Sequence, residues 1–306
     1  MTRVFIDGSA GTTGLRIADR LSERADLELI RLPEAQRKEP DARKEAIRAA
    51  DIAFLCLPDD AAKAAAAMAS DADTVLIDTS TAHRVDPSWV YGMAELPGQR
   101  ERIAGAKRIA NPGCHATGFI LLTAPLVKTG LIRPDARLSC FSLTGYSGGG
   151  KKMIAQYEQG GEPLLDAPRM YGLSQTHKHL PEMTRWSGLS HAPVFCPVVA
   201  PYLAGMEVVV SLTPDQCRGS MDDLKQVYAE TYHTPLVHFD GDASEAGFLS
   251  AAAYAGRDDL SVTVYGQEER ILLTARFDNL GKGASGAAIQ NMNLVLGLDE
   301  AASLAY

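Results

Sequence analysis

The segment with the clearest potential for chemistry is residues 111–118, which read NPGCHATG. Pro112 and Gly113 indicate a turn, and apolar residues recur at helical spacing through residues 119–127. Cys114 is therefore expected at the amino end of a helix, where unpaired N–H groups favour a thiolate and can receive an oxyanion. Because most free cysteines are simply small buried side chains, the nucleophile hypothesis needs support from other segments.

A second reactive group of side chains lies in residues 177–183, which read HKHLPEM. His177, His179 and Glu182 fit no standard zinc spacing, so no metal is expected. A histidine near a reactive cysteine serves more economically as a general acid or base, with Lys178 or Glu182 tuning or placing it. The residues alone leave open which histidine faces the sulfur.

A glycine-rich stretch opens the chain. Residues 8–14 read GSAGTTG, follow a short apolar run at 3–7 and precede a helical pattern. This strand, turn and helix is the setting in which such glycines bind a dinucleotide, although the spacing departs from the commonest form and a plain turn is the alternative. The expected cofactor contacts are Gly8, Ser9, Ala10, Gly11, Thr12, Thr13 and Gly14.

The type of dinucleotide is indicated by the second apolar run, residues 27–32. A cofactor without a 2′-phosphate usually meets an acidic side chain at the end of this strand. Here Arg31 stands at that end, and Arg37 and Lys38 follow. The pattern favours NADP(H) over NAD, with an ordinary solvated arginine as the alternative.

The first part of the chain alternates strands and helices. Strand patterns at 3–7, 27–32, 52–57 and 74–78 are separated by helical patterns, which predicts an α/β Rossmann-type domain with a parallel sheet. Ligands bind such sheets at the carboxyl ends of the strands, so Gly8, Arg31, Pro58 and Ser80 should line one crevice. A last strand is expected at 103–110, and the domain should comprise residues 1–112.

The second part of the chain has a different pattern. Strands predicted at 138–143, 205–212 and 270–277, with a helix at 221–232, no longer alternate strictly. Residues 113–283 are therefore expected to form an α+β catalytic and oligomerisation domain built on a mostly antiparallel sheet. The helix predicted within residues 284–306 should pack back on the first domain.

Two loops could bind an anion. Arg84 follows the strand at 74–78, and a guanidinium there can hold an oxyanion bidentately, although a plain surface arginine is the alternative. Residues 144–152 read TGYSGGGKK, in which glycines permit close approach and lysines supply positive charge. Ser147, Gly148 and Lys151 are the candidates in this loop, with a flexible linker as the alternative.

Composition narrows the class of protein. The net charge of −8 over 306 residues argues against a nucleic-acid surface and means that an anionic substrate needs local positive groups. Five cysteines without C-x-x-C spacing fit a reducing cytoplasm. No secretory signal and no apolar run of about 20 residues is found, so no membrane span is expected.

Together these motifs resemble the short form of the N-acetyl-gamma-glutamyl-phosphate reductase family. The resemblance covers nearly the whole length and rests on GSAGTTG (8–14), LIDTSTAHR (76–84), NPGC (111–114), GYSGGGK (145–151), HKHLPEM (177–183) and LGKGASGAAIQNMN (280–293). It implies a semialdehyde dehydrogenase or glyceraldehyde-3-phosphate dehydrogenase-like fold and an NADPH-dependent step of arginine biosynthesis. In that step N-acetyl-glutamyl 5-phosphate becomes N-acetyl-glutamate 5-semialdehyde and inorganic phosphate.

By this resemblance Cys114 is the nucleophile, which forms a thioester, and His179 is its acid/base partner. Asn279 joins the expected cofactor contacts, and Asn111 and Glu182 join the expected substrate contacts. The resemblance also implies a homodimer or homotetramer. Two positions depart from the family pattern: His115 stands where tyrosine is usual, and Val198 stands where longer members often carry histidine.

Three alternatives remain. Another phosphorylating semialdehyde dehydrogenase, such as the aspartate enzyme, would share the fold and the chemistry. A catalytically silent NADP-binding sensor is disfavoured by the presence of both Cys114 and His179. A cysteine hydrolase is disfavoured by the nucleotide-binding pattern at the amino end.

Overall fold

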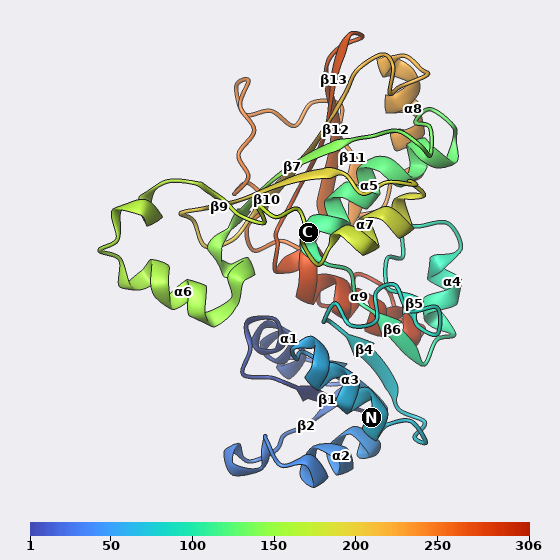
Figure 1. Cartoon of the computed structure of the whole chain (residues 1–306). Coiled ribbons are helices and arrows are strands. Elements are labelled where there is room, and N and C mark those ends of the chain that lie inside the picture. The colour runs from blue at the N-terminus through green and yellow to red at the C-terminus, as the bar shows by residue number, and fades with distance from the viewer. The chain divides into compact units, whose positions relative to one another are not determined.

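A six-stranded parallel sheet forms the centre of the first of two compact units. The computed structural model describes all of residues 1–306 (Figure 1). Its first unit contains residues 1–113 and 284–304, and its second contains residues 114–283 with 305–306. The strand order of the first sheet is β2-β1-β3-β4-β6-β5, and every neighbouring pair is parallel. Its strands are β1 (Thr2–Asp7), β2 (Leu27–Ile30), β3 (Ile52–Leu55), β4 (Val75–Asp78), β5 (Val90–Tyr91) and β6 (Arg108–Ala110).

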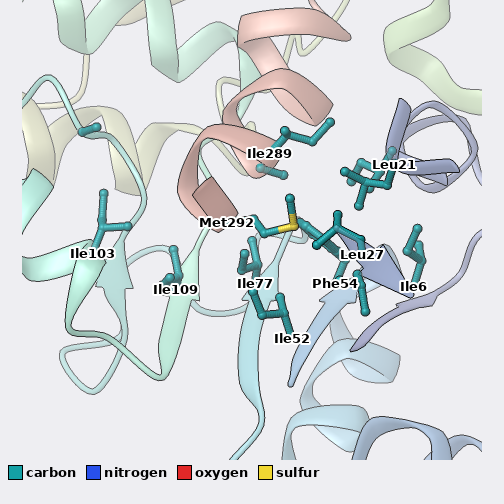
Figure 2. Close-up of a cluster of buried hydrophobic side chains, with 14 residues drawn as sticks. Ile6, Leu21, Leu27, Ile52, Phe54, Ile77, Ile103, Ile109, Ile289 and Met292 are labelled. Atoms are coloured by element: carbon teal, nitrogen blue, oxygen red, sulfur yellow. The ribbon is translucent and has the colours of Figure 1, made fainter. Parts of the chain in front are cut away.

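Helices cover both faces of this sheet, as the alternating pattern predicts. They are α1 (Thr12–Ser22), α2 (Pro40–Ala49), α3 (Asp59–Met68), α4 (Gln99–Ala104) and α9 (Gly286–Val295). On one face Ile289 and Met292 of α9 join Leu21 of α1 and Phe54 of β3 in one apolar cluster (Figure 2). On the other face Ala46 and Ile47 of α2 and Ala65 of α3 pack on a second cluster. The last helix therefore belongs to the core of the first unit.

The strand expected at 103–110 is wrong over its first half. Ile103 lies in α4, and only residues 108–110 form β6. Ile103 is fully buried in the same cluster as Ile109, so both the helix and the strand contribute apolar side chains to one core. A short apolar run cannot distinguish the two structures by periodicity. The strands β2 and β3 are also two residues shorter than expected.

The second unit contains a seven-stranded mixed sheet in the order β11-β12-β13-β10-β7-β9-β8. Four of its six neighbouring pairs are antiparallel, which confirms the predicted α+β class. The strands are β7 (Ser139–Gly145), β8 (Arg169–Met170), β9 (Val194–Ala200), β10 (Met206–Leu212), β11 (Val237–Phe239), β12 (Leu260–Gln267) and β13 (Arg270–Phe277).

Helices pack on one face of this sheet and leave much of the other exposed. α5 (Cys114–Lys128) contacts β10 and β13, α8 (Met221–Thr231) contacts β12, and α7 (Leu180–Ser187) contacts α5. A further helix, α6 (Gly150–Gln159), follows β7. On the other face Phe141 is 43% exposed and Leu272 is 42% exposed. The sheet thus has a buried face, which carries α5, and an outer face with exposed apolar side chains.

The helix α5 contains a proline that the surrounding structure accommodates. Pro125 has no N–H group to donate to Leu121 O, the partner it would have in a regular helix. Instead Tyr232 Oη donates to Leu121 O at 2.7 Å, and Tyr228 Oη donates to Leu122 O. The two tyrosines at and beyond the end of α8 therefore satisfy carbonyl groups beside the proline within a buried helix.

Removing the hydroxyl group of Tyr232 should destabilise the protein through this carbonyl. Tyr232→Phe is expected to lower the free energy of unfolding by about 1–3 kcal/mol, the cost of a buried unsatisfied polar group. In a Pro125→Ala background, the restored N–H can bond to Leu121 O, so the same substitution should cost less. Urea unfolding of the four proteins measures both effects, and equal costs in both backgrounds would contradict this explanation.

Candidate active site

Cys114 is the first residue of α5, as the turn at Pro112 and Gly113 predicts. The helix is apolar on all sides and buried from His115 to Leu122, so its position is fixed by the core. Gly283 lies directly against the cysteine, because a Cβ atom at this glycine would be 2.8 Å from the Cys114 Cβ atom. Cys114 itself is half-buried, so its sulfur combines partial access with the positive end of the helix dipole.

The residue after the nucleophile is a buried histidine with both ring nitrogens occupied. His115 Nδ1 lies 2.6 Å from Ser142 Oγ, and Nε2 lies 2.6 Å from Tyr171 Oη. Burial, reinforced by the nearby His177, lowers the pKa of His115 to about 3. At neutral pH this imidazole is therefore uncharged, with one nitrogen donating and the other accepting a hydrogen bond.

Tyr171 completes the surroundings of the cysteine. Burial raises the pKa of the Tyr171 phenol well above its ordinary value, and the negative charge of the nearby Cys114 thiolate acts in the same direction. Tyr171 thus remains a neutral hydroxyl group that shares a hydrogen bond with His115.

The structure brings the two predicted histidines to this same place. The ring of His115 lies 5.7 Å from that of His177 and 5.6 Å from that of His179, between ring centroids. The rings of His177 and His179 are perpendicular at 4.7 Å. His179 Nε2 is 3.9 Å from Glu182 Oε1, and both side chains are buried. The Glu182 carboxylate is close enough to orient the His179 ring, which suits a group that transfers protons.

The glycine-rich loop after β7 is folded more tightly than the sequence predicts. Residues Tyr146–Gly149 form a 3₁₀ turn, and α6 begins at Gly150, so Lys151 lies in its first turn and is exposed. Asn279 Nδ2 donates to Ser147 Oγ at 2.9 Å, and Asn279 Oδ1 accepts from Gly205 N at 3.0 Å. The structure thus places Asn279 in the second unit, where it holds this loop.

The glycine motif of the first unit forms a close turn at the end of β1. Gly8 has a φ of +86°, and a Cβ atom there would lie 2.2 Å from Cys56 O. Gly11 precedes α1 with no side-chain cap on the helix, and Thr12 Oγ1 is buried without a hydrogen-bond partner. The free amino end of α1 and this hydroxyl group are suited to an anionic phosphate. Ser9, Ala10, Thr13 and Gly14 lie in the same turn and first helical residues.

The charge at the end of β1 is neutralised within the first unit. Asp7 immediately precedes the glycine turn, and its carboxylate is buried. Arg43 of α2 pairs with it through Nε at 3.1 Å and Nη2 at 2.8 Å. This pair removes a negative charge that would otherwise repel a phosphate at the turn.

The ends of the other parallel strands carry the remaining predicted positions. Register aligns Asp7 with Leu55 and Leu55 with Asp78, so the carboxyl ends of β1, β3 and β4 meet at one sheet edge. Pro58 caps α3, while Arg31 directly follows β2 and is exposed. An exposed guanidinium at this position is accessible to a 2′-phosphate.

The loop after β4 is held by a buried carboxylate. Asp78 accepts hydrogen bonds from the backbone N–H and the hydroxyl group of Ser80, at 2.9 and 2.7 Å. His83 Nδ1 lies 2.6 Å from the same carboxylate, and the His83 ring stacks on Trp89 at 4.0 Å. The side chain of Ser80 therefore shapes the loop.

Arg84 and Asn111 form part of a buried network in the first unit. Arg84 Nε donates to Asn111 O at 2.9 Å, and Arg84 Nη2 donates to Thr79 O at 3.0 Å. The Asn111 side chain donates to Ala284 O and accepts from Asn291 Nδ2, both at 3.0 Å. This geometry favours a positioning function for Arg84, which places the turn that leads into Cys114.

Two further structural findings bear on function. No group of three or more histidine, cysteine, aspartate and glutamate side chains has the geometry of a metal site. None of the helices combines the length and the apolar character that crossing a bilayer requires.

Comparison with known proteins identifies the family. Residues 3–106 match the semialdehyde dehydrogenase NAD-binding domain, and residues 114–279 match the semialdehyde dehydrogenase dimerisation domain. N-acetyl-gamma-glutamyl-phosphate reductase 2 of Pseudomonas putida is 46% identical over 303 residues, which cover 96% of each chain. The chain belongs to the N-acetyl-gamma-glutamyl-phosphate reductase family. A second member, from Brucella ovis, is also 46% identical over 96% of this chain and 99% of its own.

Solved structures show the same fold outside this reductase family. Aspartate semialdehyde dehydrogenase II of Vibrio cholerae, solved with ASA, has a TM-score of 0.74 at 17% identity, with 97% of this chain and 98% of that chain covered. The enzyme of Candida albicans, solved with NADP, has a TM-score of 0.68 at 15% identity, with 97% and 98% covered. At these identities the comparison confirms the predicted semialdehyde dehydrogenase fold.

Two residues of the candidate site were not predicted from the sequence. Ser142 lies in β7 and Tyr171 directly follows β8, and both contact the His115 ring. Neither lies in a recognisable motif, so the one available signal was the alternation of β7, which places Ser142 on the buried face.

The neutral state of His115 predicts how stability depends on pH. The folded pKa of His115 lies near 3 and the unfolded pKa near 6.5, so below about pH 6.5 the unfolded chain binds a proton that the folded chain excludes. This contribution to stability is complete above about pH 6.5 and decreases as the pH falls towards 3. His115→Gln retains one donor and one acceptor but does not titrate.

The difference in unfolding free energy between the parent and His115→Gln should therefore change by about 2 kcal/mol between pH 7 and pH 5, in favour of the variant. Urea unfolding at both pH values measures this change. A difference that stays constant would mean that His115 is charged or exposed.

Proposed function

We propose that this protein catalyses the NADPH-dependent reduction of N-acetyl-glutamyl 5-phosphate to N-acetyl-glutamate 5-semialdehyde, with release of inorganic phosphate. The observation that carries the proposal is Cys114 at the amino end of a core helix, where the ring of the next residue, His115, lies 5.7 Å from that of His177 and 5.6 Å from that of His179. The chain is also 46% identical to a named reductase over 96% of its length. An acyl phosphate is the substrate that a thiolate and an acid/base pair can convert through a thioester.

The first unit has the features that a dinucleotide requires. The close turn at Gly8, the uncapped amino end of α1 and the unpartnered Thr12 hydroxyl group are the proposed pyrophosphate contacts. Arg31, with Arg37 or Lys38, is the proposed contact of the 2′-phosphate, which would make NADP(H) the preferred cofactor. When bound, NADPH supplies the hydride for the reduction.

The chemistry of the second unit follows from its side chains. The Cys114 thiolate attacks the acyl carbon, and the bond from this carbon to the phosphate oxygen breaks. Phosphate departs, and the acyl group remains on Cys114 as a thioester. After reduction, the thiohemiacetal on Cys114 loses its hydroxyl proton as its carbon–sulfur bond breaks. The aldehyde is released, and the thiolate is regenerated. We assign His179 to the transfer of this proton, because Glu182 lies 3.9 Å from its imidazole and can orient the ring.

The departing phosphate needs positive groups of its own. We propose the loop of Ser147 and Gly148 together with Lys151 of α6, because this loop is rich in glycine and is rigidly held by Asn279. Arg84 contributes through the position of Asn111, because two of its donors are bound to backbone carbonyl groups.

The substrate is tested most simply in the reverse direction. We expect phosphate-dependent reduction of NADP by N-acetyl-glutamate semialdehyde, with much lower efficiency for aspartate semialdehyde in a parallel assay. A preference for the aspartate compound would replace this proposal with the second candidate, the aspartate type of enzyme.

Substitutions at the cysteine and the histidines separate the two chemical functions. Cys114→Ser should abolish turnover and leave NADPH binding intact, because the cofactor contacts lie in the first unit. His179→Asn should slow turnover by about 10²–10⁴-fold, the usual range for a positioned acid or base. His177→Asn is the matched control with a milder effect. Steady-state kinetics and NADPH fluorescence measure these results, and a greater loss in His177→Asn would show that His177 is the acid/base.

Arg31 tests the preference for NADP. Arg31→Ala should raise the KM for NADPH far more than it lowers the rate at saturation, because a contact to the 2′-phosphate contributes to binding alone. The exposed Arg102 of α4 provides a control for the loss of a surface charge. Equal efficiency of the parent protein with NADH and NADPH would refute the assignment.

The assembly and location belong to the same proposal. The family match over residues 114–279 is to a dimerisation domain, and we propose that the outer sheet face with Phe141 and Leu272 joins copies of the chain into a homodimer or homotetramer. Phe141→Asp should then favour the monomer in sedimentation velocity. Because the mechanism needs a reduced Cys114, a cytoplasmic location is expected, and cell fractionation can test it.

A further inference from the structure

Arg169 lies on the same side of the second sheet as the nucleophile. It begins β8, where it pairs with Val199 of β9, and the pairing extends to Tyr171, whose N–H donates to Pro197 O at 3.0 Å. Successive residues of a strand point to opposite faces. Met170 is 51% exposed on the outer face, so Arg169 and Tyr171 share the buried face.

The neighbouring strands confirm this orientation. Val199, the partner of Arg169, is itself paired with Thr144 of β7, and both side chains are buried. Tyr171 reaches His115 on the helix of the nucleophile. Arg169 is therefore displaced from Tyr171 by two residues, about 7 Å along the strand, towards the row of Thr144.

Aromatic side chains hold the guanidinium of Arg169 in place. Arg169 Nη2 donates to Tyr157 Oη at 3.0 Å, and the Arg169 Cζ atom lies 5.4 Å from the centre of the Tyr157 ring. Tyr157 stacks on Tyr146 with 4.6 Å between ring centroids and an interplanar angle of 8°. The side chain is thus pre-organised beside the glycine-rich loop that Tyr146 begins.

This guanidinium has unused capacity to bind an anion. Arg169 Nε is buried and has no hydrogen-bond partner. Two other arginines pair with carboxylates, Arg43 with Asp7 and Arg276 with Glu245. Arg169 forms no ion pair. A buried charged donor without a partner is costly, and an oxyanion of a ligand would satisfy it.

We propose that Arg169 binds the α-carboxylate of the N-acetyl-glutamyl substrate. This assignment rests on the proposed function and adds a group that determines which acyl phosphates are accepted. The acyl carbon of a glutamyl chain and its α-carboxyl carbon are separated by four bonds, about 5 Å when extended. That length suits a substrate that reaches from Cys114, beside Tyr171, towards Arg169, whose backbone lies about 7 Å further along the strand.

The net negative charge of the protein means that an anionic substrate needs a positively charged group at its binding site. The substrate carries a carboxylate as well as a phosphate, and the net charge of the chain is −8. A fixed guanidinium supplies local attraction, and its planar fork matches a carboxylate better than a lysine would.

The first test separates the carboxylate from the phosphate. In the reverse reaction the aldehyde and inorganic phosphate are varied independently. Arg169→Ala should raise the KM for N-acetyl-glutamate semialdehyde about tenfold to a hundredfold, the effect expected for a charge-assisted hydrogen bond, with the KM for phosphate nearly unchanged. A rise confined to the KM for phosphate would overturn the proposal in favour of a phosphate contact.

The second test distinguishes recognition from a structural effect. The parent should prefer the α-carboxylate aldehyde over its α-carboxamide analogue by about tenfold to a hundredfold, and Arg169→Ala should lose most of this preference. A preference in Arg169→Ala equal to that of the parent would overturn the proposal. Arg270→Ala, at the exposed start of β13, is the matched control and should retain the parent's preference.

If Arg169→Ala does not fold, as judged by circular dichroism, Arg169→Lys carries the same comparison and should retain only part of the preference. A parent protein that fails to oxidise N-acetyl-glutamate semialdehyde would refute the proposed function itself. Turnover by the parent with an unchanged preference in the variant would refute the assignment of Arg169 alone.

Discussion

The candidate active site depends on one buried, uncharged imidazole directly behind the nucleophile. His115 bridges Ser142 of β7 and Tyr171, which follows β8. Its neighbour Cys114 begins the buried helix α5. Burial keeps the His115 pKa near 3, so this residue adds no charge beside the sulfur. The amino end of α5 is then the fixed source of positive potential at Cys114, and the proton transfer that we propose is assigned to His179.

Elsewhere in this acidic chain, two buried carboxylates are paired with or enclosed by neighbouring side chains. Asp7, which precedes the glycine turn, is paired with Arg43, and Asp78 is enclosed by Ser80 and His83. Buried carboxylates at the sheet edge thus have partners within the first unit. Arg169 differs because it is held by aromatic side chains and has no carboxylate, so its charge remains available to a ligand.

Short motifs in the sequence predicted the parts of the site that are formed by residues close together in the chain. The turn at Pro112 places Cys114 at a helix start, and the glycines at 8–14 form the close turn expected of them. Contacts between distant segments were not predictable, because the surroundings of His115 include Ser142 of β7 and Tyr171, which follows β8. Ile103 shows the same limit, since an apolar residue serves a helix or a strand equally well until its packing partners are known.

The central claim is that Cys114 carries the substrate as a thioester, and trapping this species tests it most directly. The protein is mixed with N-acetyl-glutamyl 5-phosphate without NADPH, quenched in acid, digested and analysed by mass spectrometry. We predict one N-acetyl-glutamyl group on the peptide of Cys114, formed with release of phosphate and retained in His179→Asn. Release of phosphate without any adduct on Cys114, or an adduct on another residue, would contradict the account.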